Sequence, residues 1–292
     1  MRIGCVRYLN TLPFYHQLDK HPSCADGKAV FHKAVPAELN RLIREGQLDI
    51  ALVSSLEYAR HPEHYQILPG LCIGAGKFSE SVLLISKVPL LELTGKTVVL
   101  SEESLSSQIL LKVLFSKLKI ESRLVSGFQA PEQMLKAGDA CLLIGDGALA
   151  FDLPKNCYRY DLSSLWNDMT GLPFCFALWV VRREFAEGSP ELVREFLSGL
   201  QETFRSNMKD KAAMLAGSGS LPQKDLLSCD RYFRYLSDLY FEWNAPLEAG
   251  LVKYYEFAKE IGELEQVPEL EYFEYSGQDL SPLVIPNKRE GS

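Results

Sequence analysis

The chain begins with MRIGCVRYLNTLPF (residues 1–14), in which a short apolar segment runs into a polar turn that leads to a proline. We expect a strand over residues 3–6 and a helix near Pro13, because proline is tolerated in the first turn of a helix. The hydroxyl of Thr11 can cap this helix. Asn10, whose amide has two donor hydrogens and an acceptor oxygen, is then left at the carboxyl end of the strand, where open α/β sheets bind ligands. The segment therefore predicts one wall of a binding cleft.

Strand-like and helix-like segments alternate through the first 182 residues. Apolar runs predict strands over residues 3–6, 30–33, 50–53, 67–73, 81–86, 97–100, 122–126, 140–144 and 174–181. Helical spacing predicts helices over residues 36–44, 106–118 and 131–137. Strands separated by helix-length segments are typical of βαβ units, so we expect an α/β fold with mostly parallel sheets. Residues 190–264, rich in Leu, Phe and Tyr, are expected to be almost wholly helical, and the polar tail after Tyr275 to be loosely ordered.

Composition and charge exclude several classes of protein. The 292 residues, 47% of them hydrophobic, provide material for about two soluble domains, and no apolar run reaches the roughly 18 residues of a membrane span. The first residues lack the basic and apolar regions of a signal peptide. The net charge of −7, with no basic stripe, argues against nucleic acid as a partner. Seven scattered cysteines without a C-x-x-C motif indicate a reducing compartment, so we expect a cytoplasmic protein, either a monomer or a homodimer.

Three further segments repeat the order of strand, polar turn and helix. They are LVSS at 52–55, VLSEESLSS at 99–107 and LIGDG at 143–147. Each directs the N-terminus of a helix, with free N–H groups and partial positive charge, beyond the end of a strand, and Ser81 adds a hydroxyl nearby. Together these segments predict a site for a small, anionic, oxygen-rich molecule. The alternatives are that Ser54, Ser101 and Ser104 only cap helices, and that the Gly145-Asp146 pair is only a tight turn.

The sequence contains no familiar motif for a metal or a nucleotide. H-E-x-x-H, clustered Cys and His residues and EF-hand spacing are absent, as are a Walker A loop and a complete G-x-G-x-x-G fingerprint. We therefore expect no metal site. Glu57 and Glu80 are carboxylates beside the predicted pocket, and Arg7 could offset the charge of a ligand; for each of them a solvated surface group is the alternative.

Six motifs follow one another in the first 174 residues. They are YLNTxP at 8–13, DIALVSSxEY at 49–58, SVLL at 81–84, SxSS at 104–107, IGD at 144–146 and TGLPF at 170–174. In this combination and order they resemble the menaquinone-biosynthesis family that includes chorismate dehydratase. The resemblance implies a two-lobed fold similar to that of type 2 periplasmic binding proteins, with a ligand cleft between the lobes and a helical C-terminal part. With residues 81–86 leading out and 174–182 leading back, the first lobe is expected to comprise residues 1–85 and 180–292, and an inserted second lobe residues 86–179.

The resemblance also implies an activity. Members of this kind are cytoplasmic lyases of the futalosine pathway that dehydrate chorismate to 3-[(1-carboxyvinyl)oxy]benzoate. Because the loss of a ring hydroxyl and a ring proton makes the ring aromatic, we expect a hydro-lyase without a cofactor. Asn10 is expected to be the catalytic residue, which positions the reacting substrate, and either a nearby Glu or the side-chain carboxylate of chorismate to accept the proton. The residues expected to bind the substrate are Tyr8, Thr11, Ser54, Ser55, Ser81, Ser104, Ser106, Ser107, Gly145 and Asp146.

Two other functions fit the same scaffold. The sister enzyme of the pathway forms 1,4-dihydroxy-6-naphthoate from cyclic de-hypoxanthine futalosine and is thought to use a histidine in its second lobe. All five histidines of this chain fall at or before His64, so the second lobe has none. The other alternative is a non-catalytic cytoplasmic binding or sensor protein for a small carboxylate. We therefore favour the dehydratase.

Overall fold

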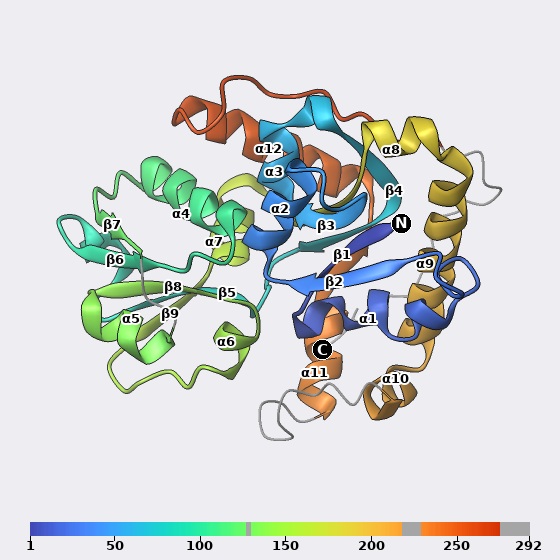
Figure 1. The fold of residues 1–292 in the computed structure, drawn as a ribbon. Helices are drawn as coiled ribbons and strands as arrows, with labels where there is room; N and C mark the ends of the chain where they lie inside the picture. Colours follow the sequence, from blue (N-terminus) through green and yellow to red (C-terminus); the bar gives the residue numbers. More distant parts are fainter. Residues whose placement is uncertain (127–129, 218–228, 275–292) are drawn as a thin grey trace.

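The computed structural model describes residues 1–126, 130–217 and 229–274, which form two α/β lobes (Figure 1). Within these residues the first sheet has six strands in the spatial order β11 (Leu239–Glu242), β4 (Tyr65–Ala75), β10 (Phe174–Arg182), β3 (Ile50–Ser54), β1 (Arg2–Val6) and β2 (Val30–Ala34). The second sheet has five in the order β7 (Arg123–Val125), β6 (Thr97–Leu100), β8 (Ala140–Ile144), β5 (Val82–Ser86) and β9 (Tyr158–Asp161). The two-lobed α/β architecture predicted from the sequence is confirmed.

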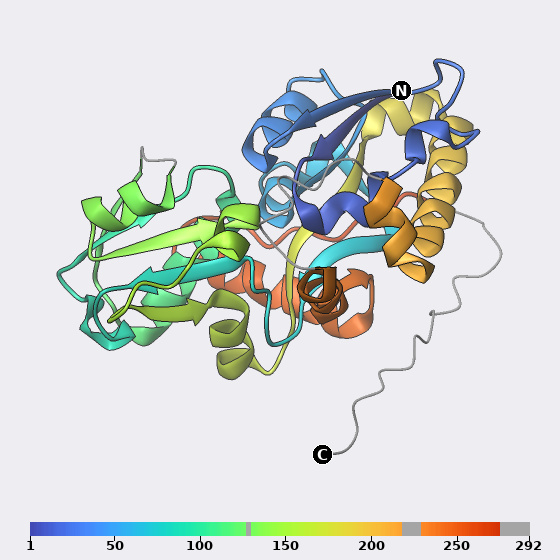
Figure 2. The same ribbon diagram turned by 90° about the horizontal axis from the view of Figure 1, so that it is seen from below.

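Helices cover the faces of both sheets (Figures 1 and 2). The first lobe carries α1 (Leu12–Tyr15), α2 (Pro36–Arg44), α3 (Ser55–Arg60), α8 (Arg183–Gly188), α9 (Pro190–Lys209), α10 (Lys211–Gly217), α11 (Cys229–Asp238) and α12 (Ala245–Glu260). The second lobe carries α4 (Leu105–Leu118), α5 (Pro131–Ala137), α6 (Gly145–Ala150) and α7 (Leu162–Thr170). Short 3-10 helices are η1 (Leu9–Thr11), η2 (Leu18–Lys20), η3 (Pro62–His64) and η4 (Leu90–Leu93). No helix in these described ranges is long and apolar enough to cross a membrane.

Both sheets are mixed, which corrects the prediction of mostly parallel sheets. In the first sheet β1 is parallel to β2 and β3, whereas β10 is antiparallel to β3 and β4, and β11 is antiparallel to β4. In the second sheet β6 is parallel to β7 and β8, whereas β5 is antiparallel to β8 and β9. Parallel pairing needs a crossover that returns the chain to the same edge. β4 and β5 lie on either side of one passage between the lobes, and β10 follows the other passage. Because the chain changes lobes at these points, it makes no crossover within one sheet there, and these strands pair antiparallel.

Strand pairing also locates the two passages between the lobes. β5 pairs with the second sheet and β10 with the first, although the sequence-based division at residues 85 and 180 cuts through both strands. We therefore propose that the lobes divide at residues 76–81 and 171–173 instead. A continuous apolar run predicts a buried strand, but it does not tell which of two sheets supplies the hydrogen-bonding partner.

Most predicted elements are found where they were expected. Helices 36–44 and 131–137 and strands 97–100 and 140–144 coincide with α2, α5, β6 and β8, and the others agree within two residues at either end. β9 and β11 were not predicted, and β11 interrupts the stretch expected to be helical. β9 has the sequence YRYD and contains no apolar run, and β11, with the sequence LYFE, lies in an aromatic-rich stretch and becomes a strand by pairing with β4. Residues 218–228 and the polar tail after Tyr275 lie outside the described residues.

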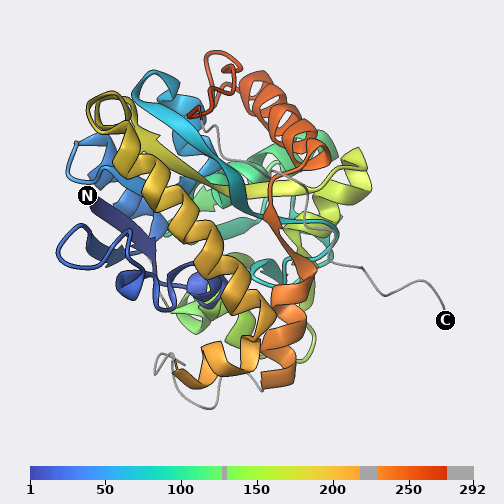
Figure 3. The ribbon, with the colours of Figure 1, turned by 90° about the vertical axis from the view of Figure 1, so that its right-hand side faces the viewer.

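An aromatic cluster anchors the segment that follows β1. Phe14 of α1 is fully buried and meets Trp179 of β10, Phe204 of α9 and Phe241 of β11 at ring-centroid distances of 5.7, 5.4 and 5.6 Å. Figure 3 shows α9 running across this side of the first lobe. Burial of one such side chain contributes about 1.5–3 kcal/mol. The cluster therefore holds α1, and with it the preceding turn that contains Asn10, against the first sheet.

Helix α12 joins the two lobes. The hydroxyl of Tyr254 donates to the carbonyl of Ser106 in α4 at 3.1 Å, and that of Tyr255 donates to the carbonyl of Ser55 in α3 at 2.6 Å. Both tyrosines are fully buried. α12 thus contacts a helix of each lobe, and in Figure 1 it lies beside α3.

Candidate functional site

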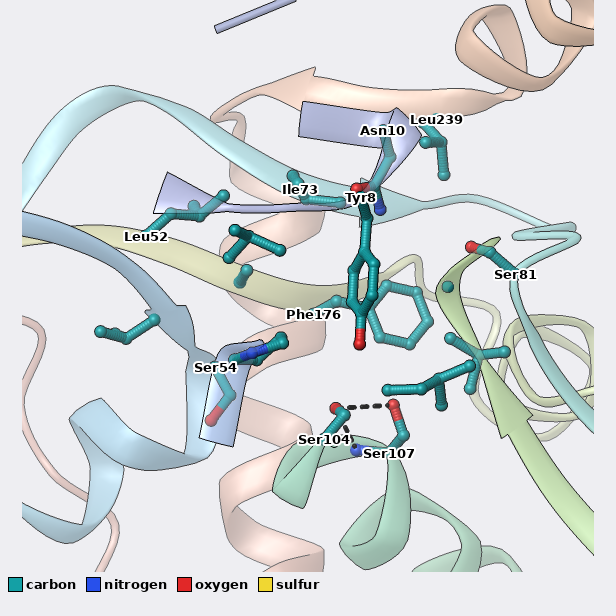
Figure 4. A pocket seen from close by; sticks show the side chains of 17 residues that line it. Tyr8, Asn10, Leu52, Ser54, Ile73, Ser81, Ser104, Ser107, Phe176 and Leu239 are labelled. Atoms are coloured by element: carbon teal, nitrogen blue, oxygen red, sulfur yellow. Dashed lines mark hydrogen bonds between the residues drawn. The ribbon is translucent and has the colours of Figure 1, made fainter. Parts of the chain in front are cut away.

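A cavity lies between the lobes where the ends of strands from both sheets meet (Figure 4). The space between its lining side chains is about 590 Å³, including the part open to solvent. Its apolar lining comes from Val6, Pro36, Leu52, Val53, Ile73, Val82, Ile144, Phe176, Ala177 and Leu239. Its other lining residues are Tyr8, Asn10, Ser54, Ser81, Ser104, Ser107 and Gly145. All seven are among the predicted site residues, and the fold brings them together from four junctions and a crossing segment.

Asn10 presents a free acceptor at the cavity wall. It lies in η1, and its Oδ1 is buried without a hydrogen-bond partner in the part of the chain that the structure describes. The side chain of Tyr235 in α11 lies close to those of Ser81 and Asn10. Burial raises the pKa of Tyr235, and these two contacts lower it by less. A buried polar atom without a partner is costly, so Oδ1 of Asn10 is the atom that a ligand donor would satisfy.

Tyr235 is a residue that sequence reasoning missed. It lies in the aromatic-rich region from 232 to 243 and is fully buried, so hydrophobic core was the default interpretation there. The only sequence signal is a tyrosine rather than a phenylalanine at a core position, since buried tyrosine hydroxyls usually find a polar partner.

Tyr8 crosses from the first lobe to the second. Its hydroxyl donates to Oε2 of Glu103 at 2.7 Å, and its ring lies against Gly145. Burial and the neighbouring carboxylate raise the pKa of Tyr8 well above its ordinary value, so the hydroxyl stays protonated as a donor. In Figure 4 the ring projects into the cavity beside Phe176.

The cavity hydroxyls are held by different partners. Ser104 caps α4, because its Oγ accepts from the backbone N–H of Ser107 at 3.4 Å, and the two hydroxyl oxygens are 3.0 Å apart (Figure 4). Ser54 does not cap α3; its Oγ accepts from Nδ2 of Asn40 at 2.8 Å, which leaves its own proton free to donate. Asn40 was also missed, although an amide on the apolar side of the helix at 36–44 is a visible signal.

Three predicted site residues direct their hydroxyls away from the cavity. The hydroxyl of Thr11 lies 2.7 Å from the carbonyl oxygen of Val6 and 2.8 Å from that of Tyr8, and it does not cap α1. Ser106 Oγ accepts from the N–H of Leu56 at 3.0 Å and is 3.3 Å from Oγ of Ser55. These two serines are fully buried. None of the three lines the cavity: the hydroxyls of Thr11 and Ser106 bind backbone groups, and that of Ser55 lies against Ser106.

Asp146 is also placed outside the cavity. Its Oδ1 accepts from the backbone N–H of Leu9 at 2.9 Å, and it lines a second, adjoining cavity together with Arg7 and Lys33. Burial raises its pKa to about 6, the Leu9 hydrogen bond lowers it, and the charge of Glu103 raises it.

The described residues lining the cavity include no Asp, Glu, Lys, Arg or His. Glu57, considered as a base, is instead bound through both oxygens by Arg44 at 2.9 and 2.8 Å and by the hydroxyl of Tyr65 at 3.0 Å. Glu80 does not line the cavity either. The arrangement can therefore bind and orient an anion through neutral hydroxyls, an amide and the N-terminus of α4.

One cluster of potential metal ligands is found among the described residues. His61, Glu63 and His64 have ligand atoms within 4.8 Å of one another. The motif search of the sequence missed this cluster. Glu63 and His64 are exposed, and none of the three lines the cavity.

The chain resembles known proteins in sequence. A family model described as menaquinone biosynthesis matches residues 1–260. A chorismate dehydratase from Thermus thermophilus is 34% identical over 222 residues, which cover 68% of this chain and 79% of that protein. A chorismate dehydratase from Campylobacter jejuni is 31% identical over 180 residues, covering 61% of this chain and 66% of that protein.

Solved structures share the fold. A crystal structure of an Archaeoglobus fulgidus protein has a TM-score of 0.71 at 19% identity, covering 90% of this chain and 98% of that one. The alkanesulfonate-binding protein SsuA from Xanthomonas axonopodis has a TM-score of 0.63 at 15% identity, covering 94% of this chain and 96% of that one. These likenesses confirm the predicted periplasmic-binding-protein-like architecture.

Proposed function

We infer that this chain, which belongs to the menaquinone-biosynthesis family, is a chorismate dehydratase: a hydro-lyase that converts chorismate to 3-[(1-carboxyvinyl)oxy]benzoate and water. The family predicted from six sequence motifs is confirmed by the match over residues 1–260. The activity is that of the curated relatives from Thermus and Campylobacter. The observation in this structure that carries the proposal is the unpartnered Oδ1 of Asn10 in a cavity lined by hydroxyls and apolar side chains.

The lining of the cavity suits the two parts of the substrate. The ring of chorismate is apolar on its faces, and Leu52, Ile73 and Phe176 offer apolar surface to it. Its carboxylates can accept hydrogen bonds from Ser54 and from the hydroxyls at the N-terminus of α4, where the helix dipole favours negative charge. We propose that the ring hydroxyl donates to Oδ1 of Asn10. Because the described lining includes no cationic side chain, these contacts orient the substrate but do not neutralise its negative charge.

The reaction needs a proton acceptor and a leaving group but no redox step. A base removes a proton from the ring carbon, the freed electron pair completes the aromatic ring, and the C–O bond to the hydroxyl breaks. The proton held by the base then passes to the departing hydroxide, which leaves as water. No carboxylate of the described residues lines the cavity, and Glu57 is engaged by Arg44 and Tyr65. We therefore propose the substrate's own side-chain carboxylate as the proton acceptor. The protein then contributes orientation and exclusion of water.

We further propose that the enzyme works in the cytoplasm, in the futalosine route. All seven cysteines are unpaired, and five of them are buried. Unpaired buried thiols are typical of a reducing compartment.

The decisive experiment is an assay of the purified protein with chorismate. Consumption of chorismate and appearance of the aromatic product, followed by absorbance and mass spectrometry, are expected. Binding of chorismate without turnover would favour a sensor, and turnover of cyclic de-hypoxanthine futalosine in its place would favour the sister enzyme; either result would overturn the proposal.

A further inference from the structure

Two carboxylates of the second lobe bind the segment that immediately precedes Asn10. Glu103, next to the start of α4, accepts from the hydroxyl of Tyr8 at 2.7 Å. Asp146, in α6, accepts from the backbone N–H of Leu9 at 2.9 Å. Tyr8 and Leu9 belong to the first lobe, so both hydrogen bonds cross the cleft. Tyr8 is two residues before Asn10 in the chain, and Leu9 is one residue before it.

The first lobe binds the same segment from its other side. The hydroxyl of Tyr232 in α11 donates to the carbonyl of Leu9 at 2.7 Å, and the hydroxyl of Thr11 lies 2.8 Å from the carbonyl oxygen of Tyr8. First-lobe groups therefore bind the carbonyl oxygens of the segment, and second-lobe groups bind its donors. The second set exists only while the lobes are together.

The two carboxylates have no other evident structural purpose. Neither Glu103 nor Asp146 takes part in an ion pair with any residue that the structure describes. Both are partly buried, and their negative charges oppose each other. Carboxylates accept stronger hydrogen bonds than neutral groups do. Glu103 and Asp146 therefore bind Tyr8 and Leu9 strongly, although the repulsion between the two carboxylates costs free energy.

We infer that Glu103 and Asp146 are positioning residues that couple closure of the lobes to the placement of Asn10. When the lobes close, the two carboxylates bind Tyr8 and Leu9 and set the backbone from which the Asn10 amide projects into the cavity. Asp146 thus acts on the protein and not on the substrate. This inference rests on the proposed dehydration, because its kinetic consequence is measured in that reaction.

The first test measures the segment itself. Hydrogen exchange of the Leu9 amide is expected to be at least tenfold faster in Asp146→Ala than in the unaltered protein, and close to normal in Asp146→Asn, whose amide oxygen still accepts. Asp152→Ala, which removes an exposed carboxylate beyond the same helix, is the matched control. Unchanged exchange at Leu9 in Asp146→Ala would overturn the inference whether or not the protein dehydrates chorismate.

The second test measures turnover. Asp146→Ala and Glu103→Ala are expected to lower kcat by roughly 10- to 100-fold, the effect of a misplaced catalytic group, with a change in KM of less than about threefold. Glu103→Gln should restore much of the loss, and Glu102→Ala, at an exposed neighbour, should leave kcat unchanged. A loss confined to thermal stability, with kcat intact, would contradict a positioning role.

A third variant avoids altering either carboxylate. Tyr8→Phe removes only the donor to Glu103, so in a double-mutant cycle Tyr8→Phe and Glu103→Ala should be non-additive in kcat. Additive effects would overturn the coupling. If the unaltered protein does not turn over chorismate at all, the proposed function fails, and the exchange measurement still decides the inference.

Discussion

The ring of Tyr8 in the first lobe lies against the backbone of Gly145, the first residue of α6 in the second lobe. A Cβ atom at position 145 would lie 2.9 Å from Cε1 of this ring, and Gly145 has a φ of +59°. Glycine is therefore required for two separate reasons: the left-handed backbone, and the space that the tyrosine ring occupies at the cavity wall.

Gly145→Ala is expected to lower kcat/KM for chorismate by at least about tenfold, because the ring of Tyr8 must move away from the position it takes beside the cavity. The control is Gly171→Ala. Gly171 also has a positive φ, of +71°, but nothing within 4 Å of its Cβ position, so this variant incurs only the backbone cost of about 1–3 kcal/mol. Equal losses of activity in the two variants would refute the role of the contact.

Asn10→Ala should abolish turnover while leaving the fold intact. Oδ1 of Asn10 has no partner among the described residues, so its removal costs little stability. We expect kcat to fall by a factor on the order of 100 or more, as for loss of one preorganised polar group, with the thermal melting temperature nearly unchanged. Steady-state kinetics and a melting curve are sufficient, and full turnover by this variant would remove Asn10 from the mechanism.

Tyr235→Phe tests the support of Asn10 from α11. The variant keeps the buried ring but removes the hydroxyl near Ser81 and Asn10, so we expect kcat/KM to fall by about tenfold, with a loss of stability of about 1 kcal/mol. Tyr58→Phe removes a hydroxyl that donates to the carbonyl of Glu269, remote from the cavity. It should lose similar stability without the loss of activity.

Asn40→Leu should weaken both stability and binding. Asn40 donates to Oγ of Ser54 and accepts from its backbone N–H at 3.2 Å; without it these buried groups lose their partner, at a cost of about 1–3 kcal/mol. Urea unfolding measures the stability, and KM is expected to rise because the Ser54 hydroxyl is no longer held. Removing the hydroxyl as well, in Asn40→Leu/Ser54→Ala, should recover part of the stability. If the double variant loses as much stability as the two single variants together, the result would argue against the pairing.

The pKa of Asp146 predicts a specific pH dependence of stability. Its folded value of about 6 lies above the ordinary value of 3.8 because of burial. The protonated form is thus favoured in the folded state, so this group's contribution is fully present below about pH 4 and is lost as the pH rises through about 6. Asp146→Asn should flatten this decline and be the more stable protein at pH 7. Thermal melts of both proteins between pH 4 and 8 measure it, and parallel curves would contradict the raised pKa.

The sequence was sufficient for elements with a strong local pattern. Helix 36–44 has apolar residues at helical spacing between a proline and a glycine, and the structure has α2 at these residues. The strand at 140–144 is a continuous apolar run bounded by polar residues and coincides with β8. Neither the partner sheet of β5 and β10 nor the strand character of 239–242 followed from such patterns, because both depend on hydrogen bonds to distant segments.

For the site, the sequence by itself determined which residue types stand at the ends of strands: Asn10, Ser54, Ser81 and Ser104 were recognisable from strand–turn–helix junctions and family motifs. Only the tertiary structure decided which of them share the cavity. It turned Thr11 and Ser106 toward backbone groups, Asp146 toward Leu9, and brought Tyr235 beside Asn10. The reason is physical: a junction fixes where a side chain begins, whereas its hydrogen-bond partner depends on the fold. Leu9 and Asp146 are 137 residues apart and Leu56 and Ser106 are 50 apart, and only the folded arrangement of the two lobes brings them together.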